Sequence, residues 1–186
     1  TIKSKADLGR LSVPFLAEIP NMRKEVSDRK ENTIIVQQGK RDVMNEAFRV
    51  LRTNIDLMLG RKDGSRVIMF TSFNPGAGKT FSIMNVAASM ALKNTTVIIV
   101  DLDLRKATLS ECLDRKHTGV AAYLNGKTDD FHPNVDELIP GLHILPVGTL
   151  PPNPTELLLS DRFSRLLDEL RNEYDYIFLD CPPIDI

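Results

Sequence analysis

Tryptophan is absent from this sequence, and cysteine and histidine are scarce, with two and three residues among 186. Cys112 and Cys181 lie far apart and form no CxxC or Cys/His cluster, so neither a disulfide framework nor a zinc site is predicted. This usage favours a reducing, cytosolic setting, and we expect Cys181 to be a small buried residue rather than a nucleophile. His117, His132 and His143 are scattered, and we expect them at the surface or in loops.

Long apolar runs and an excess of charge of one sign are also missing. No run approaches the roughly 20 apolar residues of a membrane-spanning helix. The formal net charge is -1, from 24 basic and 25 acidic residues, so no overall basic field predicts a nucleic-acid partner. Hydrophobic residues make up 42% of the chain, which is typical of a globular domain large enough to bury a core.

The sequence does contain alternating strand and helix patterns. Apolar runs predict buried strands at 66–71, 96–100, 142–147 and 176–179, and a short strand that enters a turn is expected within 13–20. Helices are expected at 41–59, 78–92 and 154–173, the last with Asn153 as N-cap, Pro154 in the first position and Glu156 at capping-box spacing. The alternation predicts an α/β fold, with three α/β/α layers and a mostly parallel sheet whose ligands bind beyond the carboxyl ends of the strands.

A glycine-rich turn follows the strand expected at 66–71 and opens the next helix, which is the context that a phosphate-binding P-loop requires. Its glycines let the backbone direct N–H groups at a phosphate, and the helix dipole adds positive charge. Lys79 is expected to contact the β- and γ-phosphates and Thr80 to bind Mg²⁺. Position 73, where the general pattern has glycine, is Phe73. The predicted nucleotide-binding residues are Asn74, Pro75, Gly76, Ala77, Gly78, Lys79, Thr80 and Phe81.

Acidic residues follow two further apolar strands. Asp101, Asp103 and Arg105 come directly after 96–100, and Asp180 follows 176–179. If the strand continues to Asp103, alternation places both of its carboxylates on the same side, beside the phosphate loop. Such carboxylates bind Mg²⁺ directly or through water, or accept a proton from an attacking hydroxyl, and Arg105 stabilises phosphoryl charge. The predicted metal site is Thr80, Asp103 and Asp180.

These motifs resemble those of the cytoplasmic kinase domain of bacterial tyrosine kinases, the BY-kinases of capsule and exopolysaccharide synthesis, which are P-loop NTPases. The resemblance covers nearly the whole chain. It includes TSFNPGAGKT at 71–80, D-x-D-x-R at 101–105, D-x-P at 180–182, and the stretches at 15–20 and 151–163. The family's E-x-x-R-x-x-R helix matches Glu46, Arg49 and Arg52, although by spacing alone these residues are typical of a solvated helix face. Ala77 stands where the family usually has an acidic residue.

The resemblance implies a tyrosine kinase that uses ATP and Mg²⁺ and phosphorylates its own C-terminal tyrosine cluster in trans. Asp101 is then expected to be the base, with Asp103 the alternative, while Lys79 and Arg105 stabilise the transferring group. The resemblance further implies that Glu46, Arg49 and Arg52 mediate assembly into a ring, an octamer. Further implied partners are a membrane polysaccharide co-polymerase, fused or separate, and an opposing tyrosine phosphatase, at the inner face of the bacterial membrane.

The resemblance also implies how the chain is organised. We expect residues 1–40 to be an N-terminal extension and 41–186 to be a kinase domain that lacks its C-terminal part, including the tyrosine cluster. Tyr174 and Tyr176 lie at a strand entrance and are expected to be structural. Tyr123, before Asn125-Gly126, is expected to be more exposed.

Two other functions fit parts of the sequence. A switch ATPase of the partitioning or septum-positioning type shares the expected fold, the aspartate pair and the Mg²⁺ site. It carries a second lysine where this chain has Asn74, so that position favours the kinase. A ring-forming regulator of polysaccharide chain length, for which nucleotide is only a ligand, is the non-enzymatic alternative.

Overall fold

The computed structural model describes residues 12–21, 34–60, 63–107, 109–110 and 118–184, and it is built around a five-stranded sheet. The strands are β1 (Arg66–Phe70), β2 (Val97–Asp101), β3 (Asp136–Ile139), β4 (Leu142–Leu145) and β5 (Tyr176–Asp180), in the order β1-β5-β2-β4-β3. Every pairing is parallel except that of β3 with β4. The mostly parallel sheet predicted from the sequence is therefore confirmed.

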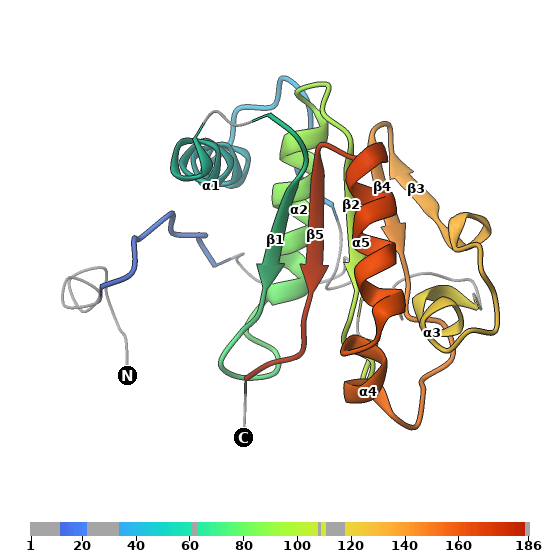
Figure 1. The fold of residues 1–186 in the computed structure, drawn as a ribbon. Coiled ribbons are helices and arrows are strands. Elements are labelled where there is room, and N and C mark those ends of the chain that lie inside the picture. The colour runs from blue at the N-terminus through green and yellow to red at the C-terminus, as the bar shows by residue number, and fades with distance from the viewer. Residues whose placement is uncertain (1–11, 22–33, 61–62, 108, 111–117, 185–186) are drawn as a thin grey trace.

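Helices cover both faces of this sheet, which gives the predicted three layers (Figure 1). In that view α2 (Lys79–Ala91) lies behind the sheet and α5 (Asp161–Glu173) in front, while α1 (Val43–Leu59) packs on α2 beyond the β1 edge. The shorter helices are α3 (Gly119–Leu124), the 3₁₀ turn η4 (His132–Asn134) and α4 (Pro154–Leu158). None of the helices among the described residues is long and apolar enough to cross a bilayer.

The central strand β2 explains why its sequence is a continuous apolar run. All five of its residues are buried, because the sheet separates two cores. Val97 and Ile99 face the core shared with α1 and α2. Ile98 and Val100 face the core shared with α3 and α5. A strand buried on both faces has no polar positions, and the polar residues begin only at its carboxyl end.

The long helix expected at 154–173 is wrong, because the structure divides it into α4 and α5. Ser160 has extended backbone angles of φ -78° and ψ 154° and starts α5 as its N-cap. Asn153 does not cap α4 through its side chain, since its Nδ2 donates to a carboxylate oxygen of Glu156 at 2.8 Å. The Ser160-Asp161 pair is itself a helix-start signal inside the apolar pattern, and here it outweighs the continuous periodicity.

The expected strand at 13–20 is also wrong, since residues 14–20 form no ladder with the described part of the sheet. The segment instead packs its Leu16 and Ile19 side chains against the core, and Asn54 on α1 donates to the Leu16 carbonyl. Pro14 and Pro20 lack the N–H groups that pairing needs. The edge strand β3 was not predicted, and the Pro140-Gly141 turn before β4 was the signal for it, with Gly141 at φ +81°.

Tyrosine and histidine side chains occupy both buried and partly exposed positions. Tyr123 was expected to be exposed but is 3% exposed, with its hydroxyl donating to Glu169 and Arg162 stacked on its ring. Tyr176 is structural as expected, because its hydroxyl donates to Asp56 at 2.8 Å. His143 was expected at the surface but lies within β4, with Nδ1 buried. His132 lies in the short 3₁₀ turn, and its ring is half-exposed. Cys112 and His117 lie outside the described residues.

Gly119 offers a test of a close backbone approach on the α3 side of the sheet. It has φ +60°, and an added Cβ would lie 2.3 Å from the Val147 carbonyl carbon. Gly126 is a matched control, since it has φ +71° but nothing within 4 Å of an added Cβ. We expect Gly126→Ala to cost about 1 kcal/mol from backbone strain and Gly119→Ala at least about 3 kcal/mol, because a clash is added. Urea unfolding measures both, and equal costs would contradict this packing.

Candidate active site

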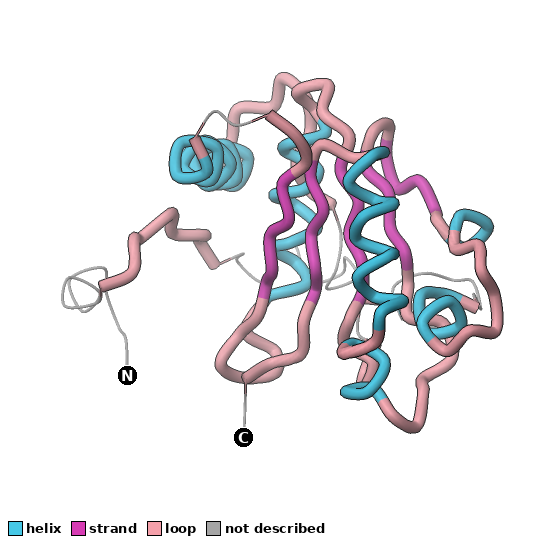
Figure 2. The backbone as a smooth tube through the Cα atoms, in the orientation of Figure 1, coloured by secondary structure: helices cyan, strands magenta, loops and turns pink. Residues whose placement is uncertain are grey.

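The carboxyl ends of β1, β5 and β2 bring three sequence motifs together at one edge of the sheet. Phe70, the last residue of β1, is in register with Asp180, and Asp180 is in register with Asp101. The loops that leave these strands lie at the lower end of the sheet in Figure 2. The phosphate loop and two of the predicted carboxylates are thus neighbours, although they lie as much as 101 residues apart in the chain.

The phosphate loop has the backbone of an anion-binding turn. Gly76 and Gly78 have φ +72° and +83°, which other residues rarely adopt, and an added Cβ at either would meet nothing within 4 Å. Helix α2 begins at Lys79 with no side-chain cap, so its first N–H groups remain available to an anion. Phe73 is not among the described residues with positive φ, which explains why the loop does not require glycine there.

Hydrogen bonds tie the phosphate loop to the chain that leaves β5. Thr71 Oγ1 donates to the Pro182 carbonyl, and the Ile184 N–H donates to the Ser72 carbonyl, both at 2.8 Å. Cys181 precedes these contacts, its N–H donates to the Phe70 carbonyl at 2.9 Å, and it is half-buried rather than fully buried. Burial raises the pKa of its thiol to about 11, so it is a poor nucleophile at neutral pH, as expected. The first and last motifs therefore form one connected unit.

Lys79 forms an ion pair with Asp180 in this state. The Asp180 side chain is 1% exposed and that of Lys79 is 10% exposed. Burial raises the pKa of Asp180, and the lysine opposes that shift through its hydrogen bond and its charge. Asp180 thus holds the lysine ammonium at the N-terminus of α2, beside the loop where a phosphate would bind.

Asp101 is fully buried and held by three hydrogen bonds. Its Oδ1 accepts from the Asp103 N–H at 3.1 Å, and its Oδ2 accepts from the Ser110 N–H at 3.0 Å and from Ser110 Oγ at 2.6 Å. Ser110 Oγ in turn accepts from the Val147 N–H. Burial raises the pKa of Asp101 to about 6, against the effect of these donors, and the charge of Asp180 raises it further. Sequence reasoning missed Ser110, because an isolated serine gives no signal.

Asp103 reaches the site through a turn rather than through the strand. Strand β2 ends at Asp101, so the expectation that alternation continues to Asp103 is wrong. The Asp103 N–H instead folds back onto the Asp101 carboxylate, and Asp103 Oδ1 accepts from the Lys106 N–H at 3.2 Å. Asp103 is 5% exposed, and its Oδ2 makes no hydrogen bond within the described ranges. Arg105 lies exposed on the same turn.

The oxygen atoms in this region suit Mg²⁺ but do not form a complete cage. Within the described residues no group of three or more His, Cys, Asp or Glu side chains has the arrangement of a metal site. Mg²⁺ usually keeps several waters and binds one or two carboxylates together with substrate phosphates, so an all-protein cage is not required. Thr80 at the start of α2, with Asp103 and Asp180, supplies hard oxygen ligands next to the loop.

The buried Asp101 predicts a pH dependence of stability in the absence of nucleotide and metal. Its pKa is about 6 in the folded protein and near 4 in the unfolded chain, so the folded state binds more protons between these values. Stability therefore falls as pH rises from 4 to 6, by up to about 3 kcal/mol from this group. We expect Asp101→Asn to remove this part of the slope in urea unfolding measured across that range. An unchanged slope would show that Asp101 is not the titrating group.

The predicted helix stripe lies away from this site, on α1. Glu46 and Arg49 form an exposed ion pair with each other. Arg52 turns towards α2, where one guanidinium nitrogen donates to the Ser89 carbonyl at 2.7 Å and contacts Ser89 Oγ at 3.2 Å. Two members of the stripe are thus available at the surface, and the third joins α1 to the end of α2.

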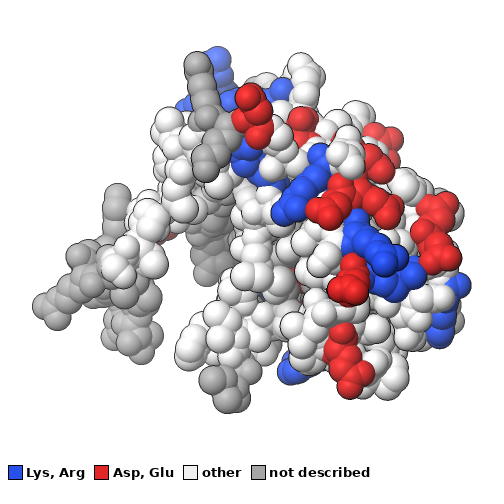
Figure 3. All heavy atoms as spheres, viewed as in Figure 1, with Lys and Arg blue, Asp and Glu red and all other residues white. Residues whose placement is uncertain are grey.

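Charged side chains on the face that α5 covers are mixed in sign. In Figure 3 the basic and acidic side chains alternate over this face, and no continuous basic area appears on it. The lower left of the same view, towards the phosphate loop, is mostly uncharged on its surface.

Comparison with known proteins points to one group. The AAA_31 family model, described as an AAA domain, matches residues 65–185. The tyrosine-protein kinase CpsD of Streptococcus pneumoniae is 36% identical over 159 residues, which are 83% of this chain and 69% of that protein. The tyrosine-protein kinase wzc of Salmonella typhimurium is 32% identical over 83% of this chain, but the match spans only 22% of that longer protein.

Comparison of the fold with solved structures points to the same group of proteins. The kinase domain of the Escherichia coli tyrosine kinase ETK superposes with a TM-score of 0.84 at 28% identity, over 97% of this chain and 73% of that domain. The region that the family model matches, residues 65–185, includes the phosphate loop, the acidic turn after β2 and the end of β5.

Proposed function

The chain belongs to the AAA domain family and, within it, to the bacterial tyrosine kinases of capsule and exopolysaccharide synthesis, and on this basis we propose that it transfers the γ-phosphoryl group of ATP to protein tyrosine. The observation that best supports this activity is the register of the three strand ends. It places an uncapped phosphate loop, the Lys79–Asp180 ion pair and the buried Asp101 side by side. Phosphoryl transfer requires such positioning of charge more than covalent chemistry by the protein.

In the proposed mechanism the loop residues 74–81 hold the ATP phosphates through the backbone, and Lys79 exchanges Asp180 for the β- and γ-phosphates. Thr80 and Asp180 would hold Mg²⁺, directly or through water, and Asp103 would hold it through water only, so that its carboxylate can still accept a proton. When bound, the ion neutralises charge on the β- and γ-oxygens. Asp180, freed from the lysine, is then available as a metal ligand. Arg105, exposed on the turn after β2, stabilises charge on the transferring group.

We propose Asp103 as the base that accepts the tyrosine proton, in preference to Asp101. Both oxygens of Asp101 already accept hydrogen bonds, and the residue is 0% exposed. The acceptor oxygen bonds to the γ-phosphorus, the bond from that phosphorus to the β–γ bridging oxygen breaks, and ADP leaves. The phenolic proton moves to Asp103, whose position Asp101 fixes through the Asp103 N–H.

We propose that the chain works at the inner face of the membrane with a polysaccharide co-polymerase and an opposing tyrosine phosphatase. Copies of it would assemble into a ring, as an octamer, through Glu46, Arg49 and Arg52 on α1. Support comes from the family and from the exposure of Glu46 and Arg49. Transfer in trans would let one copy phosphorylate a tyrosine cluster carried by another.

The proposed activity is tested with the chain, ATP, Mg²⁺ and a tyrosine-rich acceptor polymer. We expect phosphotyrosine to form on the polymer, as detected by mass spectrometry, and to require Mg²⁺. ADP release without any phosphotyrosine would favour the switch-ATPase function instead. Binding of nucleotide with neither product would favour the ring-forming regulator and would contradict the kinase proposal.

A further inference from the structure

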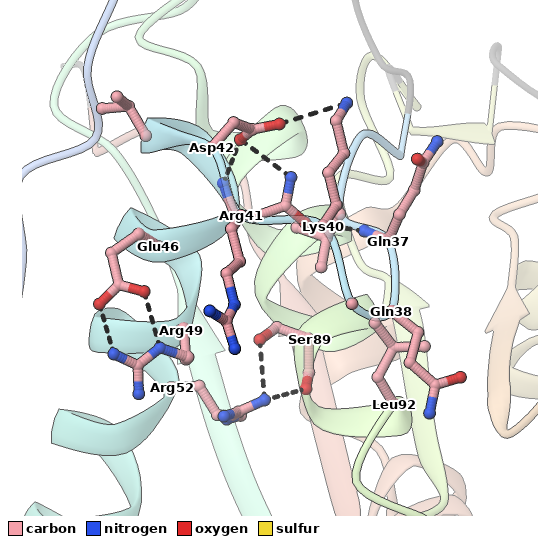
Figure 4. A pocket seen from close by; sticks show the side chains of 14 residues that line it. Gln37, Gln38, Lys40, Arg41, Asp42, Glu46, Arg49, Arg52, Ser89 and Leu92 are labelled. Atoms are coloured by element: carbon pink, nitrogen blue, oxygen red, sulfur yellow. Dashed lines mark hydrogen bonds and ion pairs between the residues drawn. The ribbon is translucent and has the colours of Figure 1, made fainter.

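A pocket lies between the start of α1 and the end of α2, away from the phosphate loop. It has a volume of about 920 Å³ and is lined by the segment 36–43, by α1 residues and by Ser89 and Leu92 (Figure 4). Helix α2 has 13 residues, so its two ends are roughly 20 Å apart. The phosphate loop opens one end of α2 and this pocket lies at the other, which makes the two sites separate.

Positive charge predominates in this pocket. Its lining includes the four cationic residues Lys40, Arg41, Arg49 and Arg52, but only the two acidic residues Asp42 and Glu46. Both carboxylates are already engaged, since Lys40 pairs with Asp42 at 3.2 Å and Arg49 pairs with Glu46. The acidic groups of the pocket therefore neutralise two of its four cations.

Arg41 and Arg52 supply the charge that is left over. Figure 4 shows their guanidinium groups directed into the same part of the pocket, with that of Arg49 close by. Within the described part of the chain, the Arg52 guanidinium donates hydrogen bonds only to the backbone carbonyl and hydroxyl of Ser89, and Asp56 is the acidic residue that acts on its charge. Burial, and repulsion by Arg49, lower the pKa of Arg52. Guanidinium groups that repel one another favour a shared anion.

The rest of the lining is apolar enough to contact a ring. Val36 is buried and packs in the core, and Leu92 lies half-buried at the end of α2. Both line the pocket together with Val43. The pocket thus combines an aliphatic wall with converging arginines. A small aliphatic wall alone would suit many ligands, but the arginines restrict the choice to an anion.

We propose that this pocket binds phosphotyrosine, with the phosphate between Arg41 and Arg52 and the aromatic ring against Val36 and Leu92. Arginine clusters recognise phosphorylated side chains through charge-assisted hydrogen bonds. Inorganic phosphate and phosphoserine share the anion but lack the ring. The inference rests on the proposed kinase activity, because phosphotyrosine is the product of that reaction. The pocket would therefore retain a phosphorylated segment at a distance from the phosphate loop. Because Glu46, Arg49 and Arg52 also belong to the proposed ring contact, peptide binding and ring assembly would compete for this surface.

The test measures binding of a short phosphotyrosine peptide by calorimetry, with ADP and Mg²⁺ present at saturation to occupy the phosphate loop. We expect binding at least ten times tighter than that of inorganic phosphate or of the matching phosphoserine peptide. Arg41→Ala and Arg52→Gln should each weaken it at least tenfold. Arg171→Ala is the control, because Arg171 is an exposed arginine on α5 that pairs with Asp168, and it should leave binding unchanged.

Three results would overturn the inference. These are no preference for phosphotyrosine over inorganic phosphate, no effect of either substitution, or an equal effect of Arg171→Ala. Arg41→Ala lies outside the residues assigned to catalysis, and its thermal unfolding checks that the fold is intact. The kinase assay is separate: phosphotyrosine formation without peptide binding would refute only this pocket, and peptide binding without phosphotyrosine formation would refute only the kinase activity.

Discussion

Replacing Lys79 with methionine is expected to reduce phosphoryl transfer by at least about 1,000-fold. The lysine is the cation at the start of α2, and the loop aims the same helix end at the phosphates. Methionine keeps the length of the side chain but removes the charge that neutralises the transferring group in the transition state. ATP binding should weaken by only about tenfold, because the backbone N–H groups of the loop still contact the phosphates.

The same substitution has a structural effect that must be separated from catalysis. Asp180 is 1% exposed in its side chain and loses its ion-pair partner, so its pKa should rise further. We expect a loss of stability of about 1–3 kcal/mol above that pKa. Lys93→Met is the control, since Lys93 is an exposed lysine just after the other end of α2. Phosphotyrosine formation at near wild-type rate in folded Lys79→Met protein would contradict the site.

Asp103→Asn is expected to lower the rate of tyrosine phosphorylation by about 100- to 10,000-fold, the usual contribution of a general base. Asparagine keeps the shape of the side chain and can still accept the Lys106 N–H hydrogen bond. It cannot accept a proton. The rate at saturating ATP and acceptor should therefore fall, while ADP binding in the absence of metal changes little.

Asp101→Asn separates the two possible bases. We expect a smaller loss of about tenfold, because Asp101 positions the turn through the Asp103 N–H rather than contacting the acceptor. The readout is the pH profile of the rate. Loss of Asp103 should remove the rise in rate that reports deprotonation of the base, and Asp101→Asn should retain that rise. The reverse result would assign the base role to Asp101, as the family resemblance implies.

Much of this architecture could be predicted because several features of the fold require recognisable local patterns in the sequence. The run at 97–100 is apolar at every position, since β2 is buried on both faces. The loop 74–80 needs glycines where φ is positive, and the aspartates follow strands whose carboxyl ends share one edge. Each of these features depends on residues close together in sequence, so the sequence alone indicates the site.

The features that the sequence did not predict depend on contacts between segments that lie far apart in the chain. Ser110 donates to Asp101 and accepts from the Val147 N–H. These hydrogen bonds join distant segments, and no local sequence pattern predicts them. Tyr123 is buried because Arg162 and Glu169 of α5 reach it across the fold. The break between α4 and α5 depends on competition between a helix-start signal and a continuous apolar periodicity, and only packing decides which prevails.

Asn74 is where the kinase and the switch ATPase differ most clearly in sequence. The switch ATPases place a second lysine there, and this chain offers an uncharged amide instead. The backbone carbonyl of Asn74 accepts from Ser72 Oγ at 3.0 Å, so the residue also belongs to the ordered part of the loop. The sequence difference and the family relationship agree, and the fate of the phosphoryl group decides between the two functions.

That fate is measured most directly with ATP labelled in its γ-phosphate. The chain is incubated with labelled ATP, Mg²⁺ and an excess of tyrosine-rich acceptor, and the label is divided between tyrosine and inorganic phosphate. We predict that most of the label transferred by the wild-type protein reaches tyrosine and that Lys79→Met transfers none above background. Label found only as inorganic phosphate, at a rate that Lys79→Met abolishes, would contradict the kinase activity while leaving the nucleotide site intact.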